Sequence, residues 1–412
     1  MNGTDILPSG SCCIAGGGPA GLMLGYLLAR AGVRVTVLEK HADFLRDFRG
    51  DTIHPSTLDV MDELGQLDEF LKLPHTRITE LIAEVNGTRV PFADFSHVPT
   101  RCKFLVMMPQ WDFLDFLADQ ARHYPHFKLL QKHEVVALQR DAAGRIFGVT
   151  AETPEGTAHF EADLVIAADG RHSLLRQAAE LPVVDYGAPI DVLWFRLPKD
   201  RNDRNQTGGY IWPGLFFVTI DRGDYWQCAY VISKGGAEEV KAAGLPALRA
   251  RLAERIPFLK DNLETLVDPE QMKLLEVQVN RLERWHAPGL LCIGDAAHAM
   301  SPVGGVGINL AIQDAVATAR LLAAPLRERR VTEADLAAVQ RRRELPTKLT
   351  QRAQVFIQGN LISAILASQA SMQDAAARLP LPMKLMQRFP VLRRIPARLV
   401  GVGLRPEHIG RE

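Results

Sequence analysis

The feature that most constrains the fold is a glycine-rich turn near the N-terminus, with the pattern GxGxxG at residues 16–21. A short apolar run, residues 12–15, precedes this turn, and residues 19–31 read as a helix with proline in its first turn. Residues 33–38 alternate β-branched side chains, which predicts a buried second strand. Strand, turn, helix and strand in this order form a βαβ unit, so we predict an α/β protein.

A turn of this kind suits the pyrophosphate of a dinucleotide. Its glycines permit a tight bend, a close approach of the backbone to the ligand and close packing of helix on strand. The helix start adds free N–H groups and a partial positive charge. Glu39 ends the second strand, 21 residues after Gly18, where a carboxylate accepts hydrogen bonds from a ribose. The predicted contacts are Gly16, Gly18, Pro19, Ala20, Gly21, Glu39 and Lys40.

A second motif, about 280 residues downstream, distinguishes between possible dinucleotides. The sequence GDAAH at residues 294–298 follows a predicted strand and leads through Pro302 into GGVGIN at residues 304–309. A strand-end aspartate can hold a polyol hydroxyl, while N–H groups at the start of the next helix meet a second polar group. FAD contains a ribitol and a nicotinamide cofactor does not, so the two motifs together favour FAD.

The chain resembles the class A flavoprotein aromatic hydroxylases, the family of p-hydroxybenzoate hydroxylase and the ubiquinone-pathway hydroxylases. The resemblance covers roughly residues 10–325, and its markers occur in the family's order. They are GGGPAG, Arg49 in FRGDTIHPSTL, Gln110 at a predicted helix start, Asp169 in the ADG motif with Ser173 and Arg176, and the GDAAH…GxN segment.

The resemblance implies a role for each marker. It places Glu39 at the adenosine ribose and Asp169 near the pyrophosphate. Arg49 and Gln110 would lie along the pyrophosphate and ribitol, and Asp295 at the ribitol. The helix start would face the pyrimidine edge of the flavin with Gly305, Gly307, Ile308 and Asn309. It also implies non-covalent FAD, and NAD(P)H bound transiently near the ADG motif, because the chain has no second GxGxxG.

The implied activity is hydroxylation of an aromatic or other electron-rich small molecule with NAD(P)H and O2, through a flavin C4a-hydroperoxide. The sequence identifies no catalytic general base, and His54 and His298 are predicted to be structural. Two alternatives stay open: a reductase or dehydrogenase of the geranylgeranyl-reductase type, and a non-catalytic FAD-binding redox partner. A GxSxG nucleophile elbow is absent from the sequence, which excludes the usual hydrolase pattern.

The resemblance predicts a Rossmann-like FAD-binding domain, a second domain with a mixed sheet, and a helical C-terminal region. The predicted divisions are residues 10–75, 106–185 and 284–325 for FAD, 76–105 and 186–283 for substrate, and 326–412 for the C-terminal region. Aromatic-rich alternation predicts the second sheet, interrupted by a helix at residues 245–256. In the family this sheet roofs the substrate cavity, so Tyr210, Trp212 and Pro302 are candidate pocket residues; the alternative is that the aromatics form sheet core.

The C-terminal region is predicted to be helical after Thr332, a candidate N-cap, with a break at Pro346 and only short helical pieces near the end. Residues 378–412 hold eight Lys and Arg against two Glu, a net charge of +6. Short helices that pack across the domain or form a homodimer contact are the favoured interpretation; the interleaved apolar residues leave a weak contact with a membrane surface as the alternative.

Composition narrows the remaining choices. Lys plus Arg and Asp plus Glu both number 48, so the net charge is zero, which argues against nucleic-acid binding. The five cysteines show neither CxxC nor metal-ligand spacing, so we expect no metal site and no disulfide framework. The N-terminus has no signal-peptide pattern, and no run reaches the ~18 apolar residues of a membrane span. We therefore expect a cytoplasmic protein.

Overall fold

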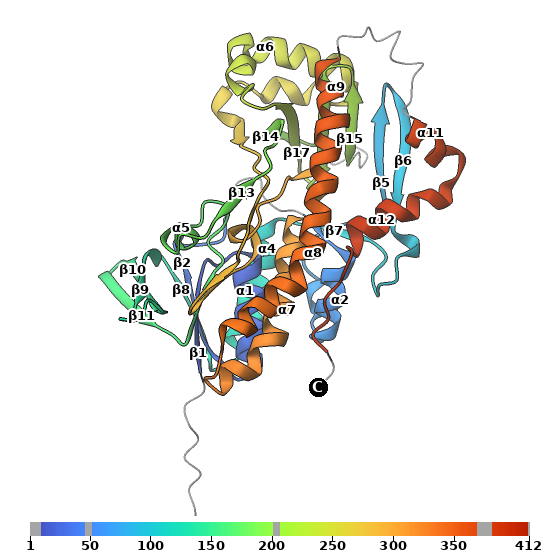
Figure 1. Ribbon diagram of the computed structural model, residues 1–412. Coiled ribbons are helices and arrows are strands. Elements are labelled where there is room, and N and C mark those ends of the chain that lie inside the picture. The colour runs from blue at the N-terminus through green and yellow to red at the C-terminus, as the bar shows by residue number, and fades with distance from the viewer. Residues whose placement is uncertain (1–9, 46–51, 201–206, 369–380, 411–412) are drawn as a thin grey trace, which may run out of the picture.

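The computed structural model describes residues 10–45, 52–200, 207–368 and 381–410. Two large sheets form its two ends, and the long helix α8 (Glu333–Ile357) runs from one end toward the other (Figure 1). The N-terminal βαβ unit belongs to the first sheet, and the aromatic-rich segments belong to the second.

The first sheet has six strands and carries the glycine-rich turn. Its spatial order is β20 (His286–Ala287), β21 (Leu290–Cys292), β12 (Leu164–Ala167), β1 (Ser11–Ala15), β2 (Arg34–Glu39) and β8 (Phe127–Gln131), all parallel except β20. Helix α1 (Pro19–Arg30) packs between α4 (Gln110–Arg122) and α7 (Gly307–Arg327). These elements share one large apolar core, as a doubly wound α/β domain requires.

Helix α7 is the one described helix that is long and apolar enough to cross a membrane by length and composition. Most of it is buried against α1 and the neighbouring turn, so here its apolar residues form protein core. The five cysteines, Cys12, Cys13, Cys102, Cys228 and Cys292, are likewise buried and unpaired.

The second sheet has seven strands drawn from two distant parts of the chain. Its order is β18 (Lys273–Leu275), β14 (Ile190–Pro198), β17 (Tyr225–Ser233), β16 (Leu215–Asp221), β15 (Gly208–Trp212), β5 (Glu80–Val85) and β6 (Thr88–Asp94). Only the β15–β5 pair is parallel, and it joins residues 80–94 to the strands from 190–275.

The two faces of this sheet pack against different partners. One face lies under helix α6 (Ala237–Arg255), which begins eight residues before the predicted start at residue 245 and is kinked at Gly244 (φ +81°). The prediction missed this first part because Gly244 and Pro246 read as a helix boundary. The opposite face carries Val192 and Val231 and packs against Val303 of the glycine-rich GGVGIN segment. The second sheet therefore faces the first domain near that segment.

The C-terminal region is helical, with one correction to the sequence prediction. Thr332 caps α8 as predicted, in a capping box with Asp335. Pro346 was predicted to break this helix, but α8 continues through it. The hydroxyls of Thr347 and Thr350 donate to carbonyls one turn earlier, at 2.9 and 2.8 Å, and buried contacts hold the helix on both sides of the proline.

Short pieces follow, as the prolines predicted. They are the π-helical turn η7 (Gln358–Ile362), α9 (Ser363–Ala367), α11 (Leu381–Arg388), η8 (Pro390–Arg393) and α12 (Arg394–Gly401). The remaining elements are β3 (Thr52–Ile53), α2 (Pro55–Glu63), α3 (Leu67–Phe70), β4 (Thr76–Ile78), η1 (Phe95–His97), β7 (Leu105–Met107), β9 (Glu134–Arg140), β10 (Ile146–Thr153), β11 (Gly156–Glu161), α5 (Leu174–Ala178), β13 (Val183–Asp185), η2 (Pro257–Leu259), η3 (Asn262–Thr265), η4 (Pro269–Gln271), β19 (Asn280–Leu282), η5 (Gly294–Ala296) and η6 (Val303–Gly305).

Candidate functional site

The glycine-rich turn is packed at its ends and open in its middle. Gly16 has φ +106°, and a Cβ there would lie 2.3 Å from the carbonyl oxygen of Ala168. A Cβ on Gly21 would lie 2.0 Å from the carbonyl oxygen of Gly16. At Gly18 a Cβ would meet nothing within 4 Å, and α1 begins there with no side-chain cap. Backbone N–H groups at the start of α1 thus border open space, which suits a bound anion.

Glu39 is held against this turn. Its carboxylate accepts the N–H of Gly17 at 2.9 Å and the N–H of His41 at 3.0 Å, and the residue is buried. Lys40 is exposed and lies 3.9 Å from Glu134 across the sheet edge. The pair follows the carboxyl end of β2, next to the turn, where a nucleotide ribose would lie.

Asp169 lies at the carboxyl end of the adjacent parallel strand β12. One of its oxygens accepts the N–H of Leu175 at 3.2 Å. The other oxygen, Oδ1, is buried and has no hydrogen-bond partner within the described part of the chain. Burial raises the pKa of Asp169, although hydrogen bonds from Ser173 and from backbone N–H groups oppose that shift. An unpartnered buried oxygen beside the glycine turn indicates a missing donor.

Arg176 connects this strand end to the GDAAH segment. Its guanidinium donates to the carbonyl oxygens of Ala296, at 3.3 Å, and of Arg171. Arg171 in turn approaches the Asp295 carboxylate at 3.9 Å. The ADG and GDAAH motifs, more than 120 residues apart in sequence, therefore form one structural unit.

Asp295 is the one residue between positions 290 and 301 that is not buried. It projects from the turn η5 at the end of β21, while the rest of the segment packs into the domain. Gly294 allows this close packing, since a Cβ there would lie 3.1 Å from the Cβ of Ala20. A half-buried carboxylate on an otherwise buried turn can still accept a hydrogen bond from a ligand hydroxyl.

The start of helix α7 completes the arrangement. No side chain caps it, and a Cβ on Gly307 would meet nothing within 4 Å. Gly305 has φ +63° and packs closely on Thr52, so it shapes the turn before the helix. Ile308 is buried. The open N-terminus of α7 offers backbone N–H groups and a partial positive charge.

The side chain of Asn309 is already engaged within the protein. Its carbonyl oxygen accepts the hydroxyls of Ser56 at 2.8 Å and Thr57 at 2.9 Å, all buried. The side-chain oxygen is therefore occupied within the protein, and the role that the resemblance implied for Asn309 uses its backbone N–H instead. The sequence did not predict a role for Ser56 and Thr57. Their contact with Asn309 spans about 250 positions, and no motif assigns a role to either hydroxyl.

Two histidines near the site, both predicted to be structural, are held by contacts within the protein. His54 is fully buried, with Nε2 2.9 Å from the carbonyl oxygen of Gly305 and Nδ1 2.7 Å from that of Val400. Burial lowers the pKa of His54. His298 lies 2.6 Å from the carboxylate of Asp314 and stacks on Trp285.

The other candidates lie around this centre. Gln110 is the first residue of α4, and Pro302 directly precedes η6 in the GGVGIN segment. Arg49 lies outside the described residues. Among the described residues, no group of three or more His, Cys, Asp or Glu side chains has the arrangement of a metal site.

The residues present fit FAD. Two uncapped helix starts, each with a glycine whose Cβ position is open space, suit the pyrophosphate and a second polar group. The half-buried carboxylate of Asp295 suits a polyol, and Glu39 suits a ribose. Asp169 Oδ1 still lacks a donor. A dinucleotide with a ribitol would supply each of these partners.

Tyr210 and Trp212, the candidate pocket residues, lie on the far side of the second sheet. Both belong to the apolar cluster beneath α6, where Tyr210 packs against Phe258 with ring centroids 5.7 Å apart. Burial raises the pKa of Tyr210 to about 12. The strand alternation that makes them sheet core points them away from Val303 and the α7 start. We therefore withdraw their assignment to the substrate pocket.

Comparisons with known proteins agree with this geometry. A family model described as FAD binding domain matches residues 10–353. The 6-methylpretetramide 4-monooxygenase of Streptomyces rimosus is 32% identical over 369 residues, which cover 88% of this chain and 87% of the relative. The para-nitrophenol 4-monooxygenase of Pseudomonas sp. strain WBC-3 is 24% identical, covering 76% of this chain and 78% of the relative.

Among solved structures, the p-nitrophenol 4-monooxygenase PnpA of Pseudomonas putida DLL-E4 superposes with a TM-score of 0.77 at 21% identity. The match covers 96% of this chain and 99% of that structure. PqsL of Pseudomonas aeruginosa, a probable FAD-dependent monooxygenase, gives a TM-score of 0.72 at 24% identity, covering 89% of this chain and 98% of that one. These likenesses establish the fold.

Proposed function

Because the chain belongs to the FAD binding domain family of flavin-dependent aromatic monooxygenases, we propose that it hydroxylates an aromatic ring of pretetramide type with NAD(P)H and O2. The support for this substrate class is the relative named 6-methylpretetramide 4-monooxygenase, which matches nearly the whole chain. The family match favours the monooxygenase over the reductase and over the non-catalytic redox partner. When bound, FAD supplies the hydride acceptance and oxygen transfer of the reaction.

The open start of α7 is the observation that carries the proposal. Its N–H groups at Gly307, Ile308 and Asn309 would face the pyrimidine edge of the flavin, where reduction places negative charge. A helix terminus stabilises such a charge by about 0.3–1 kcal/mol, and by up to ~2 kcal/mol when partly buried. Asp295 and Glu39 would fix the two ends of the cofactor through hydroxyl hydrogen bonds.

The substrate would meet the opposite face of the second sheet from Tyr210 and Trp212. On that face Trp194, Phe216 and Val218 are half-buried and pack in the same cluster as Val303. The indole N–H of Trp194 is buried and has no acceptor among the described residues. We infer that it donates to an oxygen of the substrate, while the apolar neighbours exclude water from the reacting ring.

Three further assignments are part of the proposal. The division into FAD-binding, substrate and C-terminal regions follows the two sheets and α8. The five buried and unpaired cysteines support a reducing, cytoplasmic compartment, and the exposed apolar side chains of α8, such as Leu345 and Phe356, support a homodimer. Gel filtration with light scattering measures the oligomeric state.

Flavin content and substrate-dependent oxygen consumption test the function. Purified protein should be yellow and should release FAD on acid treatment. A pretetramide-type aromatic compound should stimulate both NAD(P)H oxidation and O2 uptake, with a hydroxylated product. NAD(P)H oxidation without product would favour the reductase, and protein that stays colourless with FAD would overturn both.

Trp194→Phe tests the substrate face. This change keeps an aromatic ring but removes the N–H, so we expect a KM for the aromatic substrate raised by about tenfold, equivalent to ~1.4 kcal/mol for a lost hydrogen bond. Trp212→Phe is the matched control, because Trp212 also has a buried, unpartnered N–H but lies on the other face. Equal effects of both changes would reject the assignment.

A further inference from the structure

We propose that the outer face of the C-terminal amphipathic segment, residues 381–401, docks on an anionic lipid membrane. This segment comprises α11, η8 and α12, and it lies at the outer edge of the molecule beside β5 and β6 (Figure 1). The proposal concerns a surface rather than the flavin site, so it stands or falls independently of the hydroxylation chemistry.

The segment is fixed to the protein by its inner face. Met383 of α11 packs against the apolar cluster of the β5–β6 hairpin. Ala397 of α12 is fully buried beside Phe95, and a Cβ on Gly401 would lie 3.0 Å from the Phe95 ring. These contacts agree with the packing role considered from the sequence, and they fix the orientation of the remaining side chains.

The outer face is apolar to an unusual degree. Six large apolar side chains of the segment are each 41–69% exposed: Leu381, Leu385, Phe389, Val391, Ile395 and Leu399. Leu381 and Leu385 are four residues apart in α11, as are Ile395 and Leu399 in α12, so each pair shares one helix face. An exposed apolar face of this kind marks an interaction surface.

Basic residues accompany these apolar pairs at the same spacing. Lys384 and Arg388 flank the leucines of α11, and Arg394 and Arg398 flank Ile395 and Leu399 in α12. There is no acidic residue between positions 381 and 406.

Most of these charges are available to a partner. Arg394 contacts His97 at 3.0 Å. Lys384, Arg388 and Arg398 have no ion-pair partner among the residues that the structure describes. The partner must therefore be both apolar and anionic.

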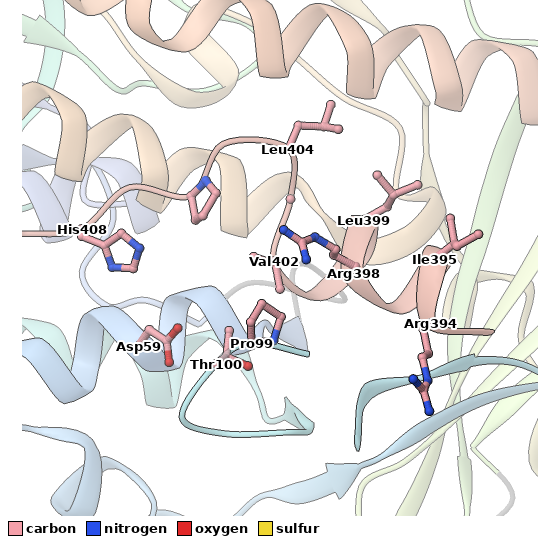
Figure 2. A pocket seen from close by; sticks show the side chains of 12 residues that line it. Asp59, Pro99, Thr100, Arg394, Ile395, Arg398, Leu399, Val402, Leu404 and His408 are labelled. Carbon is pink, nitrogen blue, oxygen red and sulfur yellow. The ribbon is translucent and has the colours of Figure 1, made fainter. Parts of the chain in front are cut away.

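A cleft of about 420 Å³ continues this surface along α12 (Figure 2). Ile395 and Leu399 project from α12 at one end of it, while Arg394 extends toward a different side. Arg398, Thr100, His408 and the carboxylate of Asp59 contribute polar groups to the lining, so its cationic side chains are those on the α12 side. Apolar walls with cationic groups match the interfacial region of a bilayer, where acyl chains meet phosphate head groups.

Charge complementarity favours a membrane over a second copy of the chain. In a two-fold symmetric contact the same patch meets itself, so the basic side chains of one copy would face those of the other. In contact with an anionic bilayer, the basic side chains of α11 and α12 would instead meet lipid phosphates, and the exposed apolar side chains would enter the acyl region. Each Lys or Arg near such a surface strengthens binding by about fivefold.

Flotation of the FAD-loaded, full-length protein with vesicles tests the proposal. We expect binding to phosphatidylcholine vesicles that contain phosphatidylglycerol and little binding to pure phosphatidylcholine. Binding should be lost as the salt concentration rises from ~0.1 M to ~1 M, because the Debye length falls from ~10 to ~3 Å. Light scattering in parallel reports self-association.

Two double variants separate the apolar from the basic contribution. Ile395→Ser with Leu399→Ser should reduce vesicle binding at least tenfold. Val267→Ser is the control, because Val267 is even more exposed than either residue but lies outside the segment. Arg388→Ser with Arg398→Ser should reduce it by roughly 25-fold. Lys128→Ser with Lys260→Ser removes the same charge from other exposed positions and should leave binding almost unchanged.

All variants should retain FAD and basal NAD(P)H oxidation, because the substituted side chains are exposed and none belongs to the residues assigned to the flavin site. Absence of vesicle binding by the wild type overturns the proposal, as does equal binding to neutral and anionic vesicles. If Ile395→Ser with Leu399→Ser converts a dimer to a monomer and no vesicles bind, the face is an interface between copies and the proposal is wrong.

Discussion

Asp295 lies in the turn after the parallel strand β21, and its carboxylate is the one part of that turn that is not buried. We expect Asp295→Ala to weaken FAD binding by about 1–3 kcal/mol, the range for a hydrogen bond that involves a charged group. Fluorescence titration of apoprotein with FAD measures the change. Glu270→Ala, an exposed acidic position in η4, is the control, and unchanged FAD affinity in Asp295→Ala would contradict the assignment.

His54 gives a prediction about pH. Because burial lowers its pKa, the folded protein binds a proton there less readily than the unfolded chain does. The stability that this histidine contributes is therefore present above the unfolded pKa of about 6.5 and is lost as pH falls through the folded value. Urea unfolding of the wild type and of His54→Gln should show a difference in free energy of unfolding that shrinks as pH falls from about 7 to 5. A difference that stays constant over that range would refute this account.

The sequence predicted those site residues whose identity is required by a close backbone contact. Gly16 and Gly21 have to be glycine because a Cβ would meet a backbone oxygen at about 2 Å, and such a requirement leaves a fixed spacing in the chain. The Ser56–Asn309 contact leaves none, since hydroxyls are common and the partner is about 250 residues away. Tyr210 was misplaced because alternation shows that a strand has two faces but not which face meets the cofactor domain.

At the scale of elements, α8 positions the segment that leads to the flavin helix. Gln351 donates to the carbonyls of Asn280 and Ala299, at 2.8 and 3.0 Å, and Gln354 donates to those of Ser301 and Val303, at 3.0 and 2.9 Å. These long-range contacts explain why the helix continues through Pro346, which local propensity alone predicts to be a break.

Gln354→Ala removes one of these supports. It leaves the carbonyls of Ser301 and Val303 without their donor, which should lower the free energy of unfolding by about 1–3 kcal/mol and weaken FAD binding. Denaturant unfolding with and without FAD measures both effects. Arg352→Ala, on the exposed side of the same helix, should change neither, and a variant as stable as the wild type would show that the support is dispensable.

At the scale of the whole molecule, a buried charge cluster joins α7, α8 and the C-terminal tail. Arg343 is fully buried between Asp314, at 3.0 Å, and Glu407, at 3.3 Å. Burial alone would raise the pKa of Asp314, but His298 and Arg343 lower it overall. Asp314 also accepts the N–H of Gly294, so the cluster connects the C-terminal tail to the turn η5, which carries Asp295.

Arg343→Met should therefore destabilise the fold by about 1–3 kcal/mol, because Asp314 and Glu407 lose their shared cation but keep His298 and Arg342 as partners. Thermal or urea unfolding measures the loss. Arg341→Met changes an exposed residue of the same helix and should alter stability by less than about 0.5 kcal/mol. Similar stability of the two variants would show that the carboxylates are compensated in another way.

The last prediction concerns communication between the two sheets. The substrate face of the second sheet, with Trp194 and Phe216, packs in one cluster with Val303, which lies four residues before the start of α7. A ligand on that sheet would therefore contact the same segment that borders the flavin. The chain has one GxGxxG unit, which FAD would occupy, and the proposal therefore lets NAD(P)H bind only transiently, beside it.

We therefore expect the aromatic substrate to accelerate reduction of bound FAD by NAD(P)H. A ligand shifts an equilibrium between two arrangements only by its difference in affinity for them, and a hundredfold preference corresponds to about 2.7 kcal/mol. Rapid-mixing absorbance at the flavin band, with and without a substrate that stimulates O2 uptake, measures the effect. Trp194→Phe should diminish the acceleration while leaving reduction without substrate unchanged, since it alters only the substrate face. Equal reduction rates with and without substrate would mean that the sheet does not control the flavin segment.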